Sequence, residues 1–375
     1  MSFDVFDERN VIVVKIGSST LVDGTGEVDH AFIACLCDQV GGLAHHGYRL
    51  IVVSSGAVAA GFRRLGLTER PTDTPSLQAC ASAGQALLID AYAQELARHG
   101  LGCGQVLLTR RDLADRQGYL NARNTLGRLL ELGSIPIVNE NDTVSVAEFT
   151  FGDNDMLGAI VSASVNADLY VILSDVDGLY SANPSQDPSA RIVRTLDHVD
   201  ARVESMAGGT GSLMGTGGMR SKLRAARLTL AAGVPTVICR GRQEGILSAV
   251  VRGEAVGTRI EGPCMGEHER ARKLWLASAE VPHGSLTLDE GAREAVCSEG
   301  ASVLPVGIAR VAGGFSAGDV IDVLATDGTL LGRGISAYDA RDLRRFRGLK
   351  LGVIERFLDG EAAQPAIHRD NLLVF

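Results

Sequence analysis

The sequence predicts an α/β protein: a mainly parallel sheet sandwiched by helices, followed by a small β-barrel-like domain. Up to about residue 260, short runs of β-branched apolar residues alternate with helical segments. Beyond about residue 262 this alternation stops, and glycines punctuate short β-type runs. At 375 residues the chain has room for two domains, which we place at 1–262 and 273–360, with the tail after Asp359 loosely held.

The strands of the larger domain are expected where apolar residues run without alternation, because this pattern is typical of strands covered on both faces. Such runs occupy residues 11–16, 50–53, 106–108, 135–138, 169–173 and 234–238. Helical segments between them are expected at 29–46, 57–65, 76–99, 119–132, 153–165 and from about 219. Strands joined by crossover helices become parallel neighbours. In the smaller domain we expect strands at 302–306 and 319–323.

Composition excludes several classes of protein. A formal net charge of −9 argues against non-specific nucleic-acid or membrane-surface binding. The acidic N-terminus lacks the basic region of a signal peptide, and no apolar run is long enough to span a bilayer. The seven cysteines are scattered without a C-x-x-C pair, which favours reduced thiols in a cytoplasmic protein. Residues 341–350 form a basic run. Because nucleic-acid binders usually carry an overall basic face and this chain is acidic, we interpret the run as a solvated structural segment rather than an RNA contact.

The glycine-rich segment at residues 215–222 reads Gly-Thr-Gly-Gly-Met-Arg-Ser-Lys and runs directly into an alanine- and arginine-rich helix. Glycines let the backbone approach a ligand, and a helix start offers N–H groups and a positive dipole end that favour phosphate. Lys222, about one turn into the helix, adds a point charge. The segment is not a P-loop, because G-x-x-x-x-G-K-[ST] is absent.

Polar residues follow the predicted strands at their carboxyl ends, which is where ligands bind in such sheets. They stand at Gly17-Ser18, Ser54-Ser55-Gly56, 139–142 and Ser174-Asp175. Lys15, in an otherwise apolar strand, either meets an anion such as phosphate or extends out of the sheet edge. Ser174-Asp175 is compatible with an Asx turn as well as with a nucleotide contact.

Two clusters of asparagine and aspartate stand about ten residues apart, Asn139 to Asp142 and Asp153 to Asp155. Each could be a helix cap, since Asn and Asp are preferred N-cap residues. Two such clusters that flank the same predicted sheet edge are less easily explained by capping, and they could hold an ammonium group and orient donors toward a carboxylate. Asp155 could order the two lysines or help to place a metal.

With these motifs assembled, the chain resembles the amino acid kinase family, and within it the glutamate 5-kinases that carry a C-terminal PUA domain. The resemblance rests on blocks around Lys15, Ser54, Asn139, Asp155 and Lys222, and on PUA-like segments at 284–292, 304–307 and 315–319. It implies glutamate binding by Ser55, Asp142 and Asn154, with Asn139 nearby. It implies nucleotide binding by Lys15, Gly17, Ser174, Asp175, Thr216, Gly217, Gly218, Met219, Arg220, Ser221 and Lys222. Our hypothesis for catalysis is that Lys15 and Lys222 supply positive charge and that Asp155 holds them in place.

The resemblance further implies ATP-dependent phosphorylation of the γ-carboxylate of L-glutamate to L-glutamyl 5-phosphate, the first step of proline biosynthesis, in the cytoplasm. Mg²⁺ with ATP, feedback inhibition by proline and a homo-oligomer (dimer or tetramer) are implied as well. A glutamyl phosphate reductase is a candidate partner, and whether it receives the acyl phosphate directly stays open. Serine at 174 and Arg220-Ser221 are mild departures from the family pattern. The physical chemistry agrees, because a carboxylate nucleophile is already ionised at neutral pH and needs no general base.

Two rival interpretations remain open. An acetylglutamate kinase would phosphorylate the same carboxylate of a blocked glutamate, but Asp142 favours a free ammonium group over an acetamide. An RNA-binding or regulatory protein built on a degenerate kinase scaffold is the alternative from a different class. The intact Lys15, Asp155 and Lys222 argue against that alternative.

Overall fold

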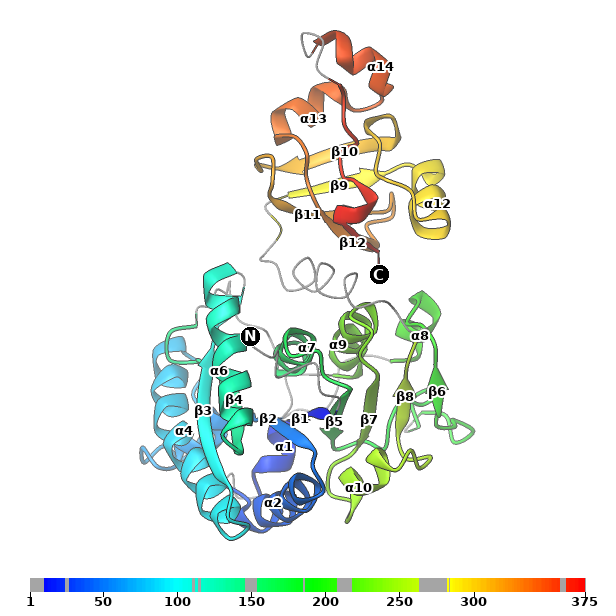
Figure 1. The fold of residues 1–375 in the computed structure, drawn as a ribbon. Coiled ribbons are helices and arrows are strands. Elements are labelled where there is room, and N and C mark those ends of the chain that lie inside the picture. The colour runs from blue at the N-terminus through cyan, green and yellow to red at the C-terminus, as the bar shows by residue number, and fades with distance from the viewer. Residues whose placement is uncertain are drawn as a thin grey trace. The chain divides into compact units, whose positions relative to one another are not determined.

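The computed structural model describes residues 10–23, 27–109, 112–113, 116–145, 154–184, 186–207, 218–262, 282, 284–357 and 362–374. The chain divides into two compact units, Met1–Cys264 and Met265–Phe375 (Figure 1). The expected linker after residue 262 falls largely outside the described residues. No helix in the described ranges is both long and apolar enough to cross a membrane.

The first unit contains an eight-stranded sheet in the order β3-β4-β2-β1-β5-β7-β8-β6. All neighbouring strands pair in parallel except β7 and β8, so the predicted mainly parallel sheet is confirmed. The strands are β1 (Val11–Ile16), β2 (Arg49–Val53), β3 (Gly102–Leu108), β4 (Ser134–Glu140), β5 (Leu169–Ser174), β6 (Thr195–Leu196), β7 (Thr236–Arg240) and β8 (Thr258–Ile260).

Helices cover both faces of this sheet. They are α1 (Ser18–Leu21), α2 (His30–His45), α3 (Ala57–Phe62), α4 (Thr74–Ala97), α6 (Arg116–Glu131), α7 (Asn154–Ser164), α8 (Ala201–Met206), α9 (Met219–Ala231) and α10 (Ile246–Val251). Helices α2, α4 and α10 pack on one face, against Ile12, Val14 and Ile16 of β1. Because side chains alternate along a strand, Lys15 points to the other face, which carries α6, α7 and α9.

Local signals explain where the longer helices begin. The side chain of Asp29 accepts a hydrogen bond from Phe32 N at 2.9 Å, and that of Asp73 accepts one from Ser76 N at 3.0 Å. These N-caps start α2 and α4 one and two residues away from the predicted starts at 29 and 76. Helix ends shift by this amount because capping contacts, rather than the apolar period, fix them.

Helices α3 and α4 cross in backbone contact through two glycines. A Cβ atom at Gly61 would lie 1.8 Å from the carbonyl oxygen of Cys80, and one at Gly84 would lie 1.9 Å from that of Ala57. Any larger residue would force the helices apart. The loop before α3 contains Gly56, whose φ of +85° lies in the left-handed region that favours glycine.

The second unit contains a five-stranded sheet in the order β10-β9-β11-β12-β13. Its elements are β9 (Gly284–Leu288), α12 (Glu290–Glu299), β10 (Ile308–Gly313), β11 (Val320–Leu324), β12 (Leu330–Ile335), α13 (Ala340–Phe346), α14 (Leu351–Ile354) and β13 (Leu372–Val374). Its core brings strand residues such as Leu286, Ile321 and Val323 together with Leu343 of α13. The predicted small β-rich domain is confirmed.

Two predictions for this unit are wrong. Residues 302–306 do not form a regular strand: Val303 makes one isolated bridge to Ile367, and a 3₁₀ turn begins at Pro305, which lacks the N–H that a ladder requires. The tail after Asp359 is not loosely held, since β13 pairs with β12 and Ile367 is fully buried. These residues therefore belong to the second compact unit, Met265–Phe375.

Candidate active site

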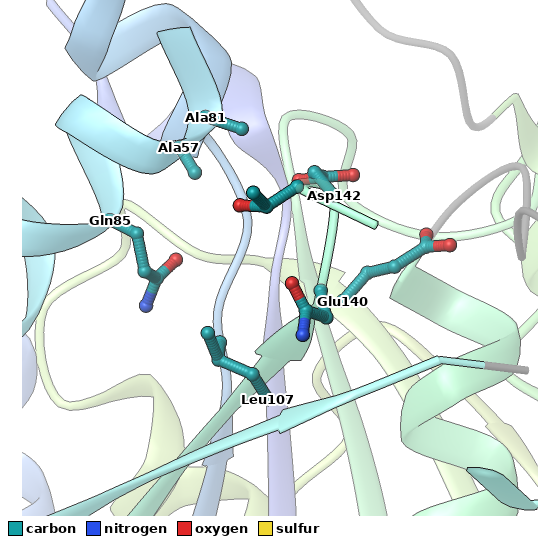
Figure 2. Close-up of a pocket in the computed structure, with 8 residues that line it drawn as sticks. Ala57, Ala81, Gln85, Leu107, Glu140 and Asp142 are labelled. Atoms are coloured by element: carbon teal, nitrogen blue, oxygen red, sulfur yellow. The ribbon is translucent and has the colours of Figure 1, made fainter. Parts of the chain in front are cut away.

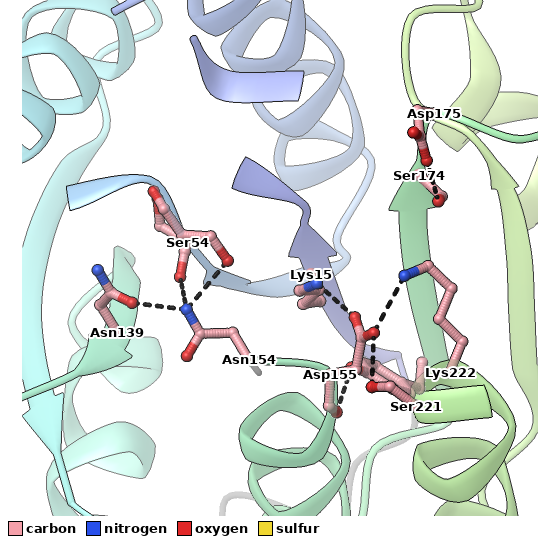
Figure 3. Close-up of polar contacts among 11 residues, drawn as sticks. Lys15, Ser54, Asn139, Asn154, Asp155, Ser174, Asp175, Ser221 and Lys222 are labelled. Carbon is pink, nitrogen blue, oxygen red and sulfur yellow. Dashed lines mark hydrogen bonds and ion pairs between the residues drawn. The ribbon is translucent and has the colours of Figure 1, made fainter. Parts of the chain in front are cut away.

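A buried carboxylate lies between two lysines at the carboxyl edge of the first sheet. Asp155 Oδ1 pairs with Lys15 Nζ, and Asp155 Oδ2 lies 3.1 Å from Lys222 Nζ (Figure 3). The side chains come from α7, β1 and α9, and the three residues are 0%, 4% and 6% exposed. The structure thus brings together the three residues for which a catalytic role is expected.

Neighbouring groups hold this cluster in place. Ser221 Oγ donates to Asp155 Oδ2 at 3.1 Å, and the hydroxyl of Tyr170 donates to the backbone carbonyl of Asp155 at 2.8 Å. Asp155 lies in the first turn of α7, where the positive end of the helix dipole favours an anion. Backbone and side chain of Asp155 are therefore both anchored.

The charge state of Asp155 follows from its surroundings. Burial by itself raises the pKa of this carboxyl, but the charges of Lys15 and Lys222 and the hydrogen bonds from them outweigh burial. The net result is a pKa below the ordinary value for aspartate. The cluster therefore contains one ionised carboxylate and two lysines.

The preceding residue, Asn154, belongs to a different network. Its Nδ2 lies 2.8 Å from the carbonyl oxygen of Ser54, 3.0 Å from Ser55 Oγ and 2.8 Å from Asn139 Oδ1. Asn139 Nδ2 in turn donates to Gln85 Oε1 at 2.7 Å. Figure 3 shows the side chains of Asn154 and Asp155 pointing to opposite sides of the helix start.

This network retains polar atoms that the described residues do not satisfy. Asn154 Oδ1 and Gln85 Nε2 are buried, and neither has a hydrogen-bond partner in the described part of the chain. Buried amide groups normally have partners, because an unpaired one costs about 1–3 kcal/mol. The network therefore offers both an acceptor and a donor to a small polar ligand.

Asp142 lies just beyond β4, beside the amide network. Figure 2 shows it lining a small pocket with Gln85, Glu140 and Ala57. Burial, and then the charge of Glu140, raise the pKa of Asp142 to about 6, while the charge of Arg70 opposes this shift. Ser145 Oγ donates to Glu140 at 2.8 Å. At neutral pH Asp142 is an anion that forms no ion pair with another described residue, which suits it to bind an ammonium group.

The structure describes most, but not all, of the residues expected to bind nucleotide. Gly17 N already donates to the carbonyl of Leu173 at 3.2 Å, so its N–H supports the sheet, and its contact with phosphate stays a prediction. Ser174 ends β5, and its hydroxyl donates to Asp175 Oδ1 at 3.1 Å. Gly218 caps α9, whose first turn contains Met219, Arg220 and Ser221. Thr216 and Gly217 lie outside the described residues.

Sequence reasoning missed three residues of this region. Gln85 holds Asn139, Tyr170 anchors Asp155, and Arg70 acts electrostatically on Asp142. Gln85 stands on the buried side of α4, and a polar residue in a stripe of small and apolar residues was a usable signal. Nothing in the local sequence marks the other two, because their contacts join distant segments.

The donor set does not provide a protein-built metal site. No group of three or more His, Cys, Asp or Glu side chains in the described ranges is arranged to hold a metal ion. Asp155, the carboxylate nearest the lysines, is engaged by both of them. The residues that the structure describes therefore do not fit a magnesium ion held mainly by carboxylates.

Comparisons with known proteins agree with this architecture. The model of the amino acid kinase family matches residues 10–240, and that of the PUA domain matches residues 284–358. A glutamate 5-kinase of Trichlorobacter lovleyi is 42% identical over 363 residues, covering 97% of this chain and 96% of the relative. A glutamate 5-kinase of Pelobacter propionicus is 43% identical over 376 positions, covering 100% of both chains.

Among solved structures, a carbamate kinase from Giardia lamblia bound to AMP-PNP matches with a TM-score of 0.51 and 17% identity. The match covers 68% of this chain and 99% of that protein, and at this identity it shows the fold alone. The family models and the curated relatives go further. The chain belongs to the amino acid kinase family, in the group of glutamate 5-kinases, and carries a C-terminal PUA domain.

Proposed function

We propose that this protein transfers the γ-phosphoryl group of ATP to the γ-carboxylate of L-glutamate, giving L-glutamyl 5-phosphate and ADP in the first step of proline biosynthesis. The observation that carries the proposal is the pair of consecutive residues Asn154 and Asp155. One joins an amide network suited to an amino acid, and the other joins a lysine cluster suited to phosphate.

The proposed reaction joins two anions. A γ-carboxylate oxygen forms a bond to the γ-phosphorus while the bond from that phosphorus to the β,γ-bridging oxygen breaks, and ADP leaves. The nucleophile is already ionised, since its ordinary pKa is roughly 4.3, and no general base is needed. Lys15 and Lys222 would supply positive charge to the transferring oxygens, and Asp155 would hold both lysines in position.

The amino-acid substrate would bind to the amide network. Asp142 would pair with its α-ammonium group, and Asn154, Ser55 and Asn139 would orient the rest of the molecule. The unpaired Asn154 Oδ1 and Gln85 Nε2 support this role, because a ligand with a donor and an acceptor would satisfy both.

ATP would bind across Lys15, Gly17, Ser174 and Asp175 and at the start of α9 (residues 218–222), with Thr216 and Gly217 preceding it. Phosphate at this position is favoured by the first-turn N–H groups of α9 together with Lys222. Mg²⁺ would reach the site mainly through the phosphate oxygens of ATP, which are its usual ligands in kinases.

Regulation and partners extend the proposal. Proline carries a cationic α-nitrogen, here a secondary ammonium group, and an α-carboxylate, so it would compete with glutamate for Asp142 and act as a feedback inhibitor. We further propose a cytoplasmic homo-oligomer, a dimer or tetramer, that passes its labile acyl phosphate to a glutamyl phosphate reductase.

The decisive experiment measures ADP and hydroxamate formation by the purified protein with Mg-ATP and hydroxylamine, which traps acyl phosphates. L-Glutamate is compared with N-acetyl-L-glutamate. Hydroxamate from free glutamate alone is the expected result, because acetylation removes the ammonium group with which Asp142 would pair. Turnover of the acetylated substrate alone would move the protein to the acetylglutamate kinases. Turnover of neither would overturn the proposed activity.

A further inference from the structure

A larger cavity shares Asp142 with the small pocket that Gln85 lines. The cavity measures about 270 Å³ and is bounded by residues of α3, of the first turns of α4 and of two loops. Val58 and Leu77 form apolar walls, whereas Arg70 and Asp142 place a cation and an anion in the same cavity. A volume of this size is ample for one small amino acid.

Arg70 lines this cavity, and the proposed function gives it no role. Its side chain is exposed, and within the described ranges its guanidinium has no hydrogen-bond or ion-pair partner. Its charge nevertheless acts on the carboxyl of Asp142, so the two groups are close enough to interact. By contrast, the buried lysines of the site, Lys15 and Lys222, are both engaged by Asp155.

A free α-amino acid presents an ammonium group and a carboxylate on the same carbon. A cavity with one anion and one cation is complementary to that pair of charges, and a planar guanidinium binds a carboxylate with two parallel hydrogen bonds. The start of α4 adds favourable charge, since Thr74, its first residue, lines the same cavity. We propose that Arg70 binds the α-carboxylate of the amino-acid substrate while Asp142 binds its α-ammonium group.

The proposal deepens the proposed function and rests on it. It makes Arg70 a binding residue that selects free α-amino acids, and it separates two carboxylates of one substrate. With the α-carboxylate bound by Arg70, the γ-carboxylate is the group left for phosphoryl transfer at the lysine cluster.

The test combines a change in the protein with a change in the substrate. L-Isoglutamine has a carboxamide in place of the α-carboxylate but keeps the ammonium group and the γ-carboxylate. Kinetics of hydroxamate formation are measured for the wild type, Arg70→Ala and Arg70→Lys with both compounds. Where isoglutamine turns over too slowly, its inhibition constant against L-glutamate replaces KM. Arg64→Ala, on the same exposed segment but outside the cavity, is the matched control.

Arg70→Ala is expected to raise KM for L-glutamate roughly 10- to 100-fold, the loss of a hydrogen bond between charged groups, with kcat nearly unchanged. The same variant should leave the KM or inhibition constant of isoglutamine near its wild-type value. Arg70→Lys should recover part of the affinity for glutamate. Arg64→Ala should behave as the wild type.

If Arg70→Ala weakened the binding of L-glutamate and of L-isoglutamine equally, the assignment would be overturned, because a purely structural role of Arg70 would not distinguish the two compounds. An unchanged KM for glutamate would overturn it as well. In either case an active wild type leaves the kinase activity standing. A wild type that phosphorylates neither compound would instead overturn the proposed function, and the role of Arg70 with it.

Discussion

Asn154 and Asp155 are neighbours in the chain, yet they belong to two halves of the site with opposite character. The half around Asp155 is charged, and its carboxylate is engaged by Lys15, Lys222 and Ser221. The half around Asn154 consists of amides and hydroxyls, and it retains buried polar atoms that no described residue satisfies. Both halves are fixed by the same helix start, α7.

The difference indicates how each half would work. The charged half is preorganised: its lysines are held before any anion arrives, so little reorganisation is needed when charge develops on a phosphoryl group. The amide half is completed by its ligand, since a substrate would satisfy the unpaired atoms, and an analogue that lacks the matching groups would leave them unpaired. We therefore expect changes in the charged half to act on kcat and changes in the amide half to act on KM.

The largest expected effect comes from Lys222→Ala. Removing this cation should lower kcat about 10²- to 10³-fold, as loss of a preorganised transition-state donor does, while KM for glutamate changes little. Steady-state kinetics give both constants, and Arg224→Ala, an exposed arginine on the same helix, is the matched control. An unchanged kcat would remove Lys222 from the mechanism.

Asn154→Ala tests the other half. The change removes the Nδ2 group that donates to Ser54, Ser55 and Asn139. KM for L-glutamate should rise about tenfold or more, corresponding to one lost hydrogen bond to a charged ligand, while KM for ATP stays near its wild-type value. If KM for ATP rose equally, the two halves would not be functionally separate.

The pH dependence of substrate binding should report on Asp142. With a pKa of about 6, this carboxyl is protonated below that pH and then cannot pair with an ammonium group. KM for glutamate should therefore rise up to about tenfold for each pH unit below 6 and level off above it.

Two variants sharpen this prediction. Glu140→Gln removes a negative charge that raises the pKa of Asp142, so the midpoint of the profile should move to lower pH. Asp142→Asn should flatten the profile altogether. A midpoint that stays at the same pH in Glu140→Gln would show that another group titrates.

The smallest effect is expected for Tyr170→Phe. The change removes the hydroxyl that donates to the backbone carbonyl of Asp155 and leaves that carbonyl short of one partner in a buried region. Stability should fall by about 1–2 kcal/mol, measured by denaturant unfolding, with at most a small decrease in kcat. A large loss of kcat at unchanged stability would instead indicate that the anchor positions the charged cluster.

Much of the fold could be predicted, because local pattern carries it. Apolar runs gave β1 and β5, and the caps at Asp29 and Asp73 account for the one- and two-residue differences in helix starts. The second unit was harder. A three-residue run such as Leu372–Val374 becomes a strand only because β12 offers it a partner, and no local period announces that pairing.

By itself, the sequence determined which residues are candidates for the site: Lys15 in an apolar strand, Asn154 and Asp155 at a helix start, and Lys222 one turn into another helix. Residue type and local spacing suffice for this, since charge in an apolar setting requires a partner. Which residue serves as that partner was decided only by the tertiary structure. Lys222 and Asp155 are 67 residues apart, and the crossovers of a parallel sheet bring them to 3.1 Å. The same applies to Gln85 and Arg70, because their contacts depend on how α3, α4 and β4 pack.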